Sequence, residues 1–137
     1  MKRIVKVAAA IIQDGERILA MQRGHGEFAG MWEFPGGKVE TGETSRNALE
    51  REIQEEMDAE IQVEELFYTV EYNYPDFHLS MDCFLCTLLS ETWKRKEHMD
   101  SRWLTAKELD SVPWLPADVG LIGRLKERME NIRRNPD

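Results

Sequence analysis

The sequence predicts an α/β (α+β) fold in which helices cover the faces of a mixed β-sheet. Strand-forming runs recur along the chain, two stretches carry apolar residues at helical spacing, and short turn signals separate these segments. The 137 residues contain no internal repeat, linker or low-complexity segment. We therefore expect one domain over residues 1–137, long enough for a single core.

An N-terminal hairpin is the first expected element. Ile4 to Gln13 is an apolar run typical of a buried strand, and Arg17 to Gln22 predicts a second strand. Asp14-Gly15 between them is a turn signal. The polar, glycine-rich residues 24–30 that follow predict a loop, a kind of segment that often borders a site.

An extended segment and the main helix come next. Trp32 to Phe34 should be extended, because Pro35 disfavours helical geometry in the residue before it. Thr44 or Ser45 can cap the helix that follows. Apolar residues at every fourth position of that helix predict a stripe that packs on the sheet: Leu49, Ile53 and Met57.

A long antiparallel pair is predicted from residues 61–72 and 77–89, which join at Tyr74-Pro75-Asp76. Its second strand contains Cys83-Phe84-Leu85-Cys86, which has the form of a redox or zinc motif. Residues three apart on a strand point to opposite faces, so two buried structural cysteines are the better interpretation.

The C-terminal part predicts a short strand and two helices. The strand ends at Leu104, and residues 105–108 have the form of a capping box that begins a short helix. A longer helix should run from about Ala117 to Arg133. Its apolar stripe is expected in the core: Leu121, Leu125, Met129 and Ile132.

Composition and charge exclude several classes of partner. The net charge of −8 argues against binding to a nucleic-acid polymer, which needs a basic face. It permits a nucleotide, whose phosphates arrive with their own cation. The apolar run from Val5 to Ile12 is too short to span a membrane, so we expect no membrane partner and a cytoplasmic location. Either a monomer or a homodimer is compatible with the sequence.

The main helix also carries a concentrated acidic face. Glu52, Glu55 and Glu56 lie within an arc of about 100°. Like charges at this spacing repel one another, and a hard divalent cation would remove the conflict. Clustered carboxylates and a backbone carbonyl from a glycine turn suit Mg2+ or Mn2+ and leave room for phosphate oxygens. Taken alone, the three glutamates are explained at least as well by a solvated acidic face.

The residues around this face resemble the Nudix box, G-x5-E-x7-R-E-U-x-E-E-x-G-U, in which U is a bulky aliphatic residue. Gly37, Glu43 and the run from Arg51 to Glu56 match every fixed position of its first part. Asp58 stands where the pattern has the helix-ending glycine, and Ala59 where it has a larger aliphatic residue. We expect Asp58 to cost on the order of 1 kcal/mol locally, with the metal ligands intact.

Three further segments resemble the MutT branch of the family, which includes the 8-oxo-dGTP sanitising enzymes and the CTP pyrophosphohydrolases. They are Trp32 to Lys38, Tyr74-Pro75-Asp76 and Leu115-Pro116-Ala117-Asp118. The resemblance implies the Nudix α/β/α sandwich. It also implies hydrolysis of a nucleoside triphosphate to the monophosphate and pyrophosphate, with Mg2+ or Mn2+ as cofactor.

The resemblance also assigns roles to the residues of the box. The backbone carbonyl of Gly37 and the carboxylates of Glu52 and Glu56 would be metal ligands. Glu55 would be a further ligand or a water-mediated partner. Arg51 would hold the Glu43 carboxylate, and the neighbouring carboxylates, through guanidinium bonds.

Glu97 lies where the branch often has an extra glutamate. It would bind a further metal ion or act on the attacking water, and a loop acid among lysines is the alternative. The general base is either Glu52 or Glu97. For the adjacent His98, a solvent-exposed loop histidine is favoured over a role in proton transfer.

Five residues are candidates for substrate binding. Arg23 and Lys38 could contact phosphates or be ordinary surface cations. Phe34 and Tyr74 could wall or stack on the base, with buried packing as the alternative. Asp118 would face the base by resemblance to the branch, or else cap the final helix.

The expected function is Mg2+-dependent nucleoside triphosphate pyrophosphohydrolysis, with a preference for CTP and related cytosine nucleotides. Sanitation of 8-oxo-dGTP is the enzymatic alternative. A nucleotide-binding sensor without turnover is the alternative from another class. The presence of every box acid speaks against the sensor.

Overall fold

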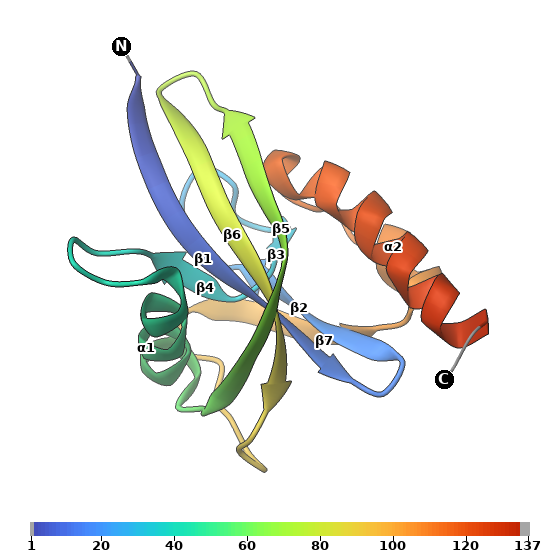
Figure 1. Cartoon of the computed structure of the whole chain (residues 1–137). Coiled ribbons are helices and arrows are strands. Elements are labelled where there is room, and N and C mark those ends of the chain that lie inside the picture. The colour runs from blue at the N-terminus through green and yellow to red at the C-terminus, as the bar shows by residue number, and fades with distance from the viewer. Residues whose placement is uncertain (1, 135–137) are drawn as a thin grey trace.

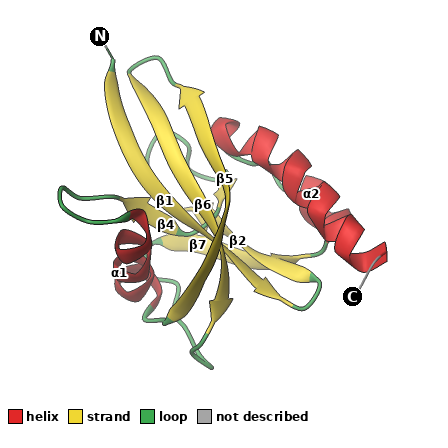
Figure 2. Cartoon of the chain, viewed as in Figure 1, coloured by secondary structure: helices red, strands yellow, loops and turns green. Residues whose placement is uncertain are grey.

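The computed structural model describes residues 2–134, which form a seven-stranded mixed sheet with a helix on each face (Figures 1 and 2). This is the α/β/α arrangement that the sequence predicts. The strands are β1 (Arg3–Asp14), β2 (Arg17–Arg23), β3 (Trp32–Glu33), β4 (Gly36–Lys38), β5 (Ile61–Asn73), β6 (Phe77–Leu88) and β7 (His98–Leu104). The helices are α1 (Ser45–Met57) and α2 (Val119–Arg134), with short 3-10 helices η1 (Ala106–Ser111) and η2 (Pro116–Asp118).

The sheet has the order β3-β2-β1-β6-β5, with β4 also paired to β1 and β7 to β2. β1 runs parallel to β6 and antiparallel to β2 and β4. On one edge β1 pairs with β4 over residues 7–9 and with β2 only at Gln13 and Asp14. Between these two pairings the backbone N–H of Ala10 donates to the Pro35 carbonyl at 2.8 Å. The change of partner therefore brings the segment before the glycine pair against the middle of β1.

The two predicted antiparallel pairs are confirmed. β1 and β2 form the expected hairpin, with Asp14 opposite Arg17. β5 and β6 pair antiparallel from Ile61 opposite Leu88 to Asn73 opposite His78, with register shifts between Val63 and Tyr68.

Alternating side chains of β1 divide the core into two layers. Ala8, Ala10 and Ile12 face α1, whereas Ala9 and Ile11 belong to the layer under α2. The predicted stripe of α1 lies in the first layer, and its three members are fully buried: Leu49, Ile53 and Met57.

The two cysteines behave as predicted. Cys83 packs in the layer under α2 and Cys86 in the layer under α1, and both are free thiols. Burial raises the pKa of the Cys86 thiol to about 12 and that of Cys83 further still. Neither thiol is therefore suited to redox chemistry or zinc binding.

The predicted helix caps are also confirmed, whereas one core assignment is wrong. Thr44 caps α1, and its side chain accepts from the Asn47 backbone N–H at 3.1 Å. Thr105 and Glu108 form the expected capping box at η1. The assignment of Ile132 to the core is wrong: its side chain is 48% exposed. Ile132 borders an open cavity, whereas Met129 just before it on α2 still packs against the core.

Ile53→Ala should lower the free energy of unfolding by about 2–5 kcal/mol, because it removes a fully buried side chain between α1 and the sheet. Denaturant unfolding measures this loss. Ile132→Ala is the matched control and should change the stability by less than about 0.5 kcal/mol. An equal loss in both variants would contradict the assignment of Ile132 to the surface.

Candidate active site

The glycine pair brings the backbone of β4 against both β1 and α1. A Cβ at Gly36 would overlap the Ala8 carbonyl oxygen and lie 2.9 Å from the Ala9 Cα. A Cβ at Gly37 would overlap the Glu52 carboxylate. Only glycine permits the backbone approach at Gly36, whereas a side chain at Gly37 would displace the Glu52 carboxylate. The Gly37 backbone and the acidic face of the helix therefore lie together, as the sequence predicts.

Arg51 organises the carboxylates around this point. Its guanidinium holds Glu43 in a two-point contact, with Nε at 2.8 Å from Oε2 and Nη2 at 2.9 Å from Oε1. It also donates to Glu52 Oε1 at 2.9 Å and to the Lys38 carbonyl at 3.2 Å. The Arg51 hydrogen bonds lower the pKa of Glu43 to about 2. These are the contacts predicted for the arginine, with one more to the backbone of β4.

Glu56 is the most deeply placed of the helix acids. Its Oε2 atom is buried without a hydrogen-bond partner among the described residues. Burial, together with the charges of Glu52, Glu33 and Glu97, raises the pKa of Glu56 to about 8. A cation at this carboxylate would reverse the shift, because opposite charge stabilises the ionised form. The orphaned oxygen and the surrounding carboxylates, which are hard oxygen donors, fit a divalent cation such as Mg2+.

Two adjoining cavities open beside Glu56. The polar cavity, about 210 Å³, is bordered by the loop from Gly24 to Gly26 and by Glu97. The apolar cavity, about 340 Å³, extends along β1 to Asp118. Four residues border both cavities and mark where the two join: Arg23, Glu33, Glu56 and His98.

Glu33 connects the groups at this junction. It accepts from Arg23 Nε at 3.2 Å, and its Oε2 lies 3.0 Å from His98 Nε2. The expectation that His98 is a solvent-exposed loop residue is wrong: it begins β7, and its side chain is only 7% exposed. Sequence reasoning missed Glu33. The sequence feature that could have identified it is an acidic residue between two aromatic residues, just before the glycine pair.

All five predicted substrate-binding residues border the apolar cavity. Arg23, Lys38, Phe34, Tyr74 and Asp118 all line it. The Phe34 ring also stacks on Trp114, with the ring centroids 5.0 Å apart. The Tyr74 hydroxyl accepts from the Ala117 backbone N–H at 3.3 Å. Both aromatic residues therefore contact neighbouring side chains or backbone and also line the apolar cavity.

Sequence reasoning missed two further aromatic walls of this cavity, Phe28 and Phe77. Both rings pack against Tyr74, with centroids at 5.7 and 5.0 Å respectively. No local pattern marks Phe28, which lies in the glycine-rich loop. It reaches the cavity because the loop folds back, with the Gly30 N–H donating to the Arg23 carbonyl at 2.8 Å.

Asp118 closes the far end of the apolar cavity. It is 3% exposed, and its Oδ1 has no hydrogen-bond partner within residues 2–134. Burial raises the pKa of Asp118 to about 8, with the Glu33 charge in the same direction and Arg23 opposing it. Its carboxyl group therefore holds a proton at neutral pH and offers one donor and one acceptor.

The predicted metal-binding set is only partly assembled. Over residues 2–134, no three acidic, histidine or cysteine side chains are grouped as a ready metal site. Glu52 accepts from Arg51, and the Glu55 side chain is 60% exposed and borders neither cavity. Gly37, Glu52 and Glu56 do come together, and Glu97 faces Glu56 across the polar cavity.

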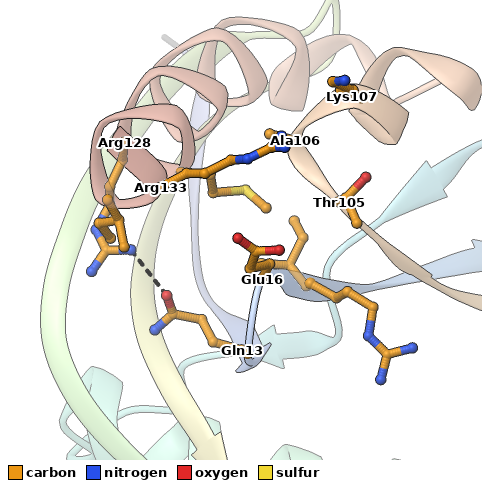
Figure 3. Close-up of a pocket in the computed structure, with 12 residues that line it drawn as sticks. Gln13, Glu16, Thr105, Ala106, Lys107, Arg128 and Arg133 are labelled. Atoms are coloured by element: carbon orange, nitrogen blue, oxygen red, sulfur yellow. Dashed lines mark hydrogen bonds between the residues drawn. The ribbon is translucent and has the colours of Figure 1, made fainter. Parts of the chain in front are cut away.

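A separate cavity of about 480 Å³ lies between the β1–β2 turn, the start of η1 and the end of α2 (Figure 3). Its lining includes Arg17, Lys107, Arg128 and Arg133, and Arg128 donates to Gln13 Oε1 at 2.9 Å. It shares no residue with the other two cavities, and no predicted site residue borders it. It therefore takes no part in the site described above.

The α/β/α sandwich and the glutamates gathered around Arg51 and Gly37 define a hydrolase of the Nudix class. The family model described as NUDIX domain matches residues 7–123, and the chain belongs to this family.

Relatives support the same assignment. A CTP pyrophosphohydrolase of Escherichia coli is 34% identical over 134 residues, covering 89% of this chain and 90% of the relative. An 8-oxo-dGTP diphosphatase of Haemophilus influenzae is 35% identical over 133 residues, covering 95% and 97%. The solution structure of a MutT protein of methicillin-resistant Staphylococcus aureus has a TM-score of 0.74 at 35% identity, covering 93% of this chain and 99% of that one. The predicted MutT-like resemblance is thus confirmed.

Within residues 2–134, no helix is long and apolar enough to cross a membrane.

Asp118→Asn should change how stability depends on pH. An acid whose pKa rises from 3.8 to about 8 on folding stabilises the folded state below pH 4, and this contribution is lost as pH rises towards 8. Asparagine does not titrate. We therefore expect the variant, relative to wild type, to gain at least about 1 kcal/mol between pH 5 and pH 8.5. Urea unfolding of both proteins at the two pH values measures this gain. If the stability difference between variant and wild type is the same at both pH values, Asp118 is not a buried, protonated acid.

Proposed function

We propose that the chain, as a single domain, is a Mg2+-dependent nucleoside triphosphate pyrophosphohydrolase with a preference for CTP and related cytosine nucleotides. The products are the nucleoside monophosphate and pyrophosphate. The observation that carries the proposal is the Glu56 carboxylate, whose Oε2 has no hydrogen-bond partner among the described residues. This carboxylate lies where the polar cavity meets the apolar cavity that ends on Asp118. A cytoplasmic location stays a prediction from the sequence.

The residues of the polar cavity would act on the triphosphate. Hydrolysis joins a water oxygen to phosphorus and breaks a phosphoanhydride bond, so its main requirements are positioning and charge stabilisation. When bound, Mg2+ neutralises charge on the phosphate oxygens, and Mn2+ has similar preferences. Gly37, Glu52 and Glu56 would hold the cation, with Glu55 and Glu97 as further candidates.

Other residues at this end would orient the reactants. Arg51 fixes Glu52 and Glu43. Arg23, held by Glu33, and Lys38 would contact phosphates. The base would be Glu52 or Glu97, whichever reaches the attacking water.

Asp118 and the aromatic walls would bind the base in the apolar cavity. The Watson–Crick edge of cytosine presents an acceptor, N3, next to a donor, the N4 amino group. A protonated carboxyl at Asp118 presents the complementary donor and acceptor. Phe34 and Tyr74, with Phe28 and Phe77, would enclose the ring.

Two alternatives lead to different outcomes. The similarity to 8-oxo-dGTP diphosphatases favours 8-oxo-dGTP as the second candidate substrate. A nucleotide-binding sensor would bind nucleotide without turnover.

Pyrophosphate release, with phosphate counted separately, should be measured across CTP, dCTP, 8-oxo-dGTP, dGTP and ADP-ribose, with Mg2+ and with chelator. Nucleotide binding without any release would support the sensor.

Glu56→Gln should reduce turnover of the best nucleotide by at least about 100-fold, because it removes the charge of the buried carboxylate. It should also abolish the rise in melting temperature that Mg2+ produces in wild type. Glu65→Gln, an exposed glutamate of β5, is the control and should behave as wild type. Full turnover in Glu56→Gln would contradict the proposed metal-binding role.

For CTP, kcat/KM of wild type should fall as pH rises from 7 to 8.5, since Asp118 loses the proton that is donated to the base. Asp118→Asn keeps a donor and an acceptor without titrating, so its kcat/KM should vary less over this range. Parallel pH profiles of the two proteins with CTP test the difference. Superimposable profile shapes would exclude Asp118 as a base contact that depends on protonation.

A further inference from the structure

Asp58 occupies the helix-ending position where the Nudix box has glycine. Its backbone is left-handed, with φ 50° and ψ 43°, and no other non-glycine residue in the range 2–134 has a positive φ. A residue with a Cβ is disfavoured in this conformation, and a negative charge is disfavoured at the C-terminal end of a helix. Glycine would avoid both costs, so the side chain must have compensating contacts.

These contacts are with the segment between β6 and β7, residues 89–97. Lys96 Nζ lies 2.7 Å from Asp58 Oδ1, and Lys94 Nζ lies 3.6 Å from Oδ2. Both lysines also bring positive charge to the end of α1, where it is favourable. One carboxylate thus ties two positions of the segment to the helix.

The backbone of the same segment closes the last turn of α1. The Lys94 N–H donates to the Met57 carbonyl at 2.8 Å, and the Lys96 N–H donates to the Glu56 carbonyl at 3.3 Å. These carbonyls have no partner within the helix. The hydrogen bond from the Lys96 N–H is long for an N–H···O bond. The ion pair between the Lys96 side chain and Asp58 is therefore the shorter of the two contacts that hold this residue.

Glu97 follows Lys96 directly and borders the polar cavity opposite Glu56. Residues 89–97 contain no helix or strand. The position of the Glu97 carboxylate therefore depends on how its neighbours are held. His98 on one side is held in β7 and by Glu33. Lys94 and Lys96 on the other side are held by the end of α1, the helix that carries Glu52 and Glu56.

We propose that Asp58 is a positioning residue, which uses its ion pairs with Lys96 and Lys94 to fix Glu97 at the cavity. The departure from glycine thereby links the metal-binding helix to the segment that carries Glu97. The inference rests on the proposed function for its kinetic readout, whereas its structural readout is independent of turnover.

The test compares Asp58→Asn, Asp58→Gly and Lys96→Gln with Lys126→Gln. The control breaks an exposed ion pair of similar length, Lys126 to Asp110 at 2.9 Å, between α2 and η1. Hydrogen exchange at the Lys94 and Lys96 amides, followed by NMR without added metal, should be faster in the first three variants and unchanged in the control. Unchanged exchange in Asp58→Asn and Lys96→Gln would overturn the proposal.

Kinetics separate positioning from stability. The Asp58 and Lys96 side chains are 36% and 44% exposed, and exposed ion pairs contribute modestly, so kcat should fall about two- to fivefold with KM unchanged. Asp58→Gly should show this loss even though its melting temperature equals or exceeds that of wild type, because glycine suits the left-handed position. A wild-type kcat in Asp58→Gly would overturn the proposal.

A double variant tests whether the effect passes through Glu97. In a Glu97→Gln background, Asp58→Asn should cause no further loss of kcat. A further loss as large as in wild type would overturn the proposal. If the wild-type protein turns over no nucleotide, the proposed function fails, and the amide exchange rates alone decide whether Asp58 holds the segment.

Discussion

The site depends on placing several carboxylates of like charge at one end of a helix whose other face is buried. α1 is fixed to the sheet by Leu49, Ile53 and Met57, so Glu52 and Glu56 cannot move apart without unpacking the core. Arg51 offsets part of the repulsion through its bonds to Glu43 and Glu52. Glu56 Oε2 has no hydrogen-bond partner among the described residues, and burial, followed by the charges of the neighbouring carboxylates, raises the pKa of Glu56. The folded state therefore holds like charges close together at a cost in stability.

The sheet explains why the backbone comes close to these acids. β1 pairs with β4 first and with β2 later, and the glycine pair lies at the start of β4, where the two partners separate. Side chains at Gly36 and Gly37 would collide with β1 and with Glu52. The sheet therefore supplies a backbone wall for the acidic helix, and the cavity opens beside it.

Two different environments meet at Glu33. On one side lie Glu56 and Glu97, and on the other lie aromatic rings that end at Asp118. Glu33 is bonded to Arg23 and His98, and its charge raises the pKa of both Glu56 and Asp118. A substrate with a charged end and a flat, weakly polar end is complementary to this division.

The sequence by itself determined the order of the elements, the family and the box. Periodicity fixed the buried face of α1, and the turn signals fixed both hairpins, because local spacing and backbone preference act within a few residues. The left-handed Asp58 was expected because the resemblance places it where the box has its helix-ending glycine. Only the tertiary structure decided that His98 is buried, that Ile132 is exposed and that Phe28 and Phe77 wall the apolar cavity. It likewise placed Glu33 between Arg23 and His98, and Asp58 against Lys96. These features join residues far apart in the sequence, and their burial depends on which strands become neighbours, which no local pattern records.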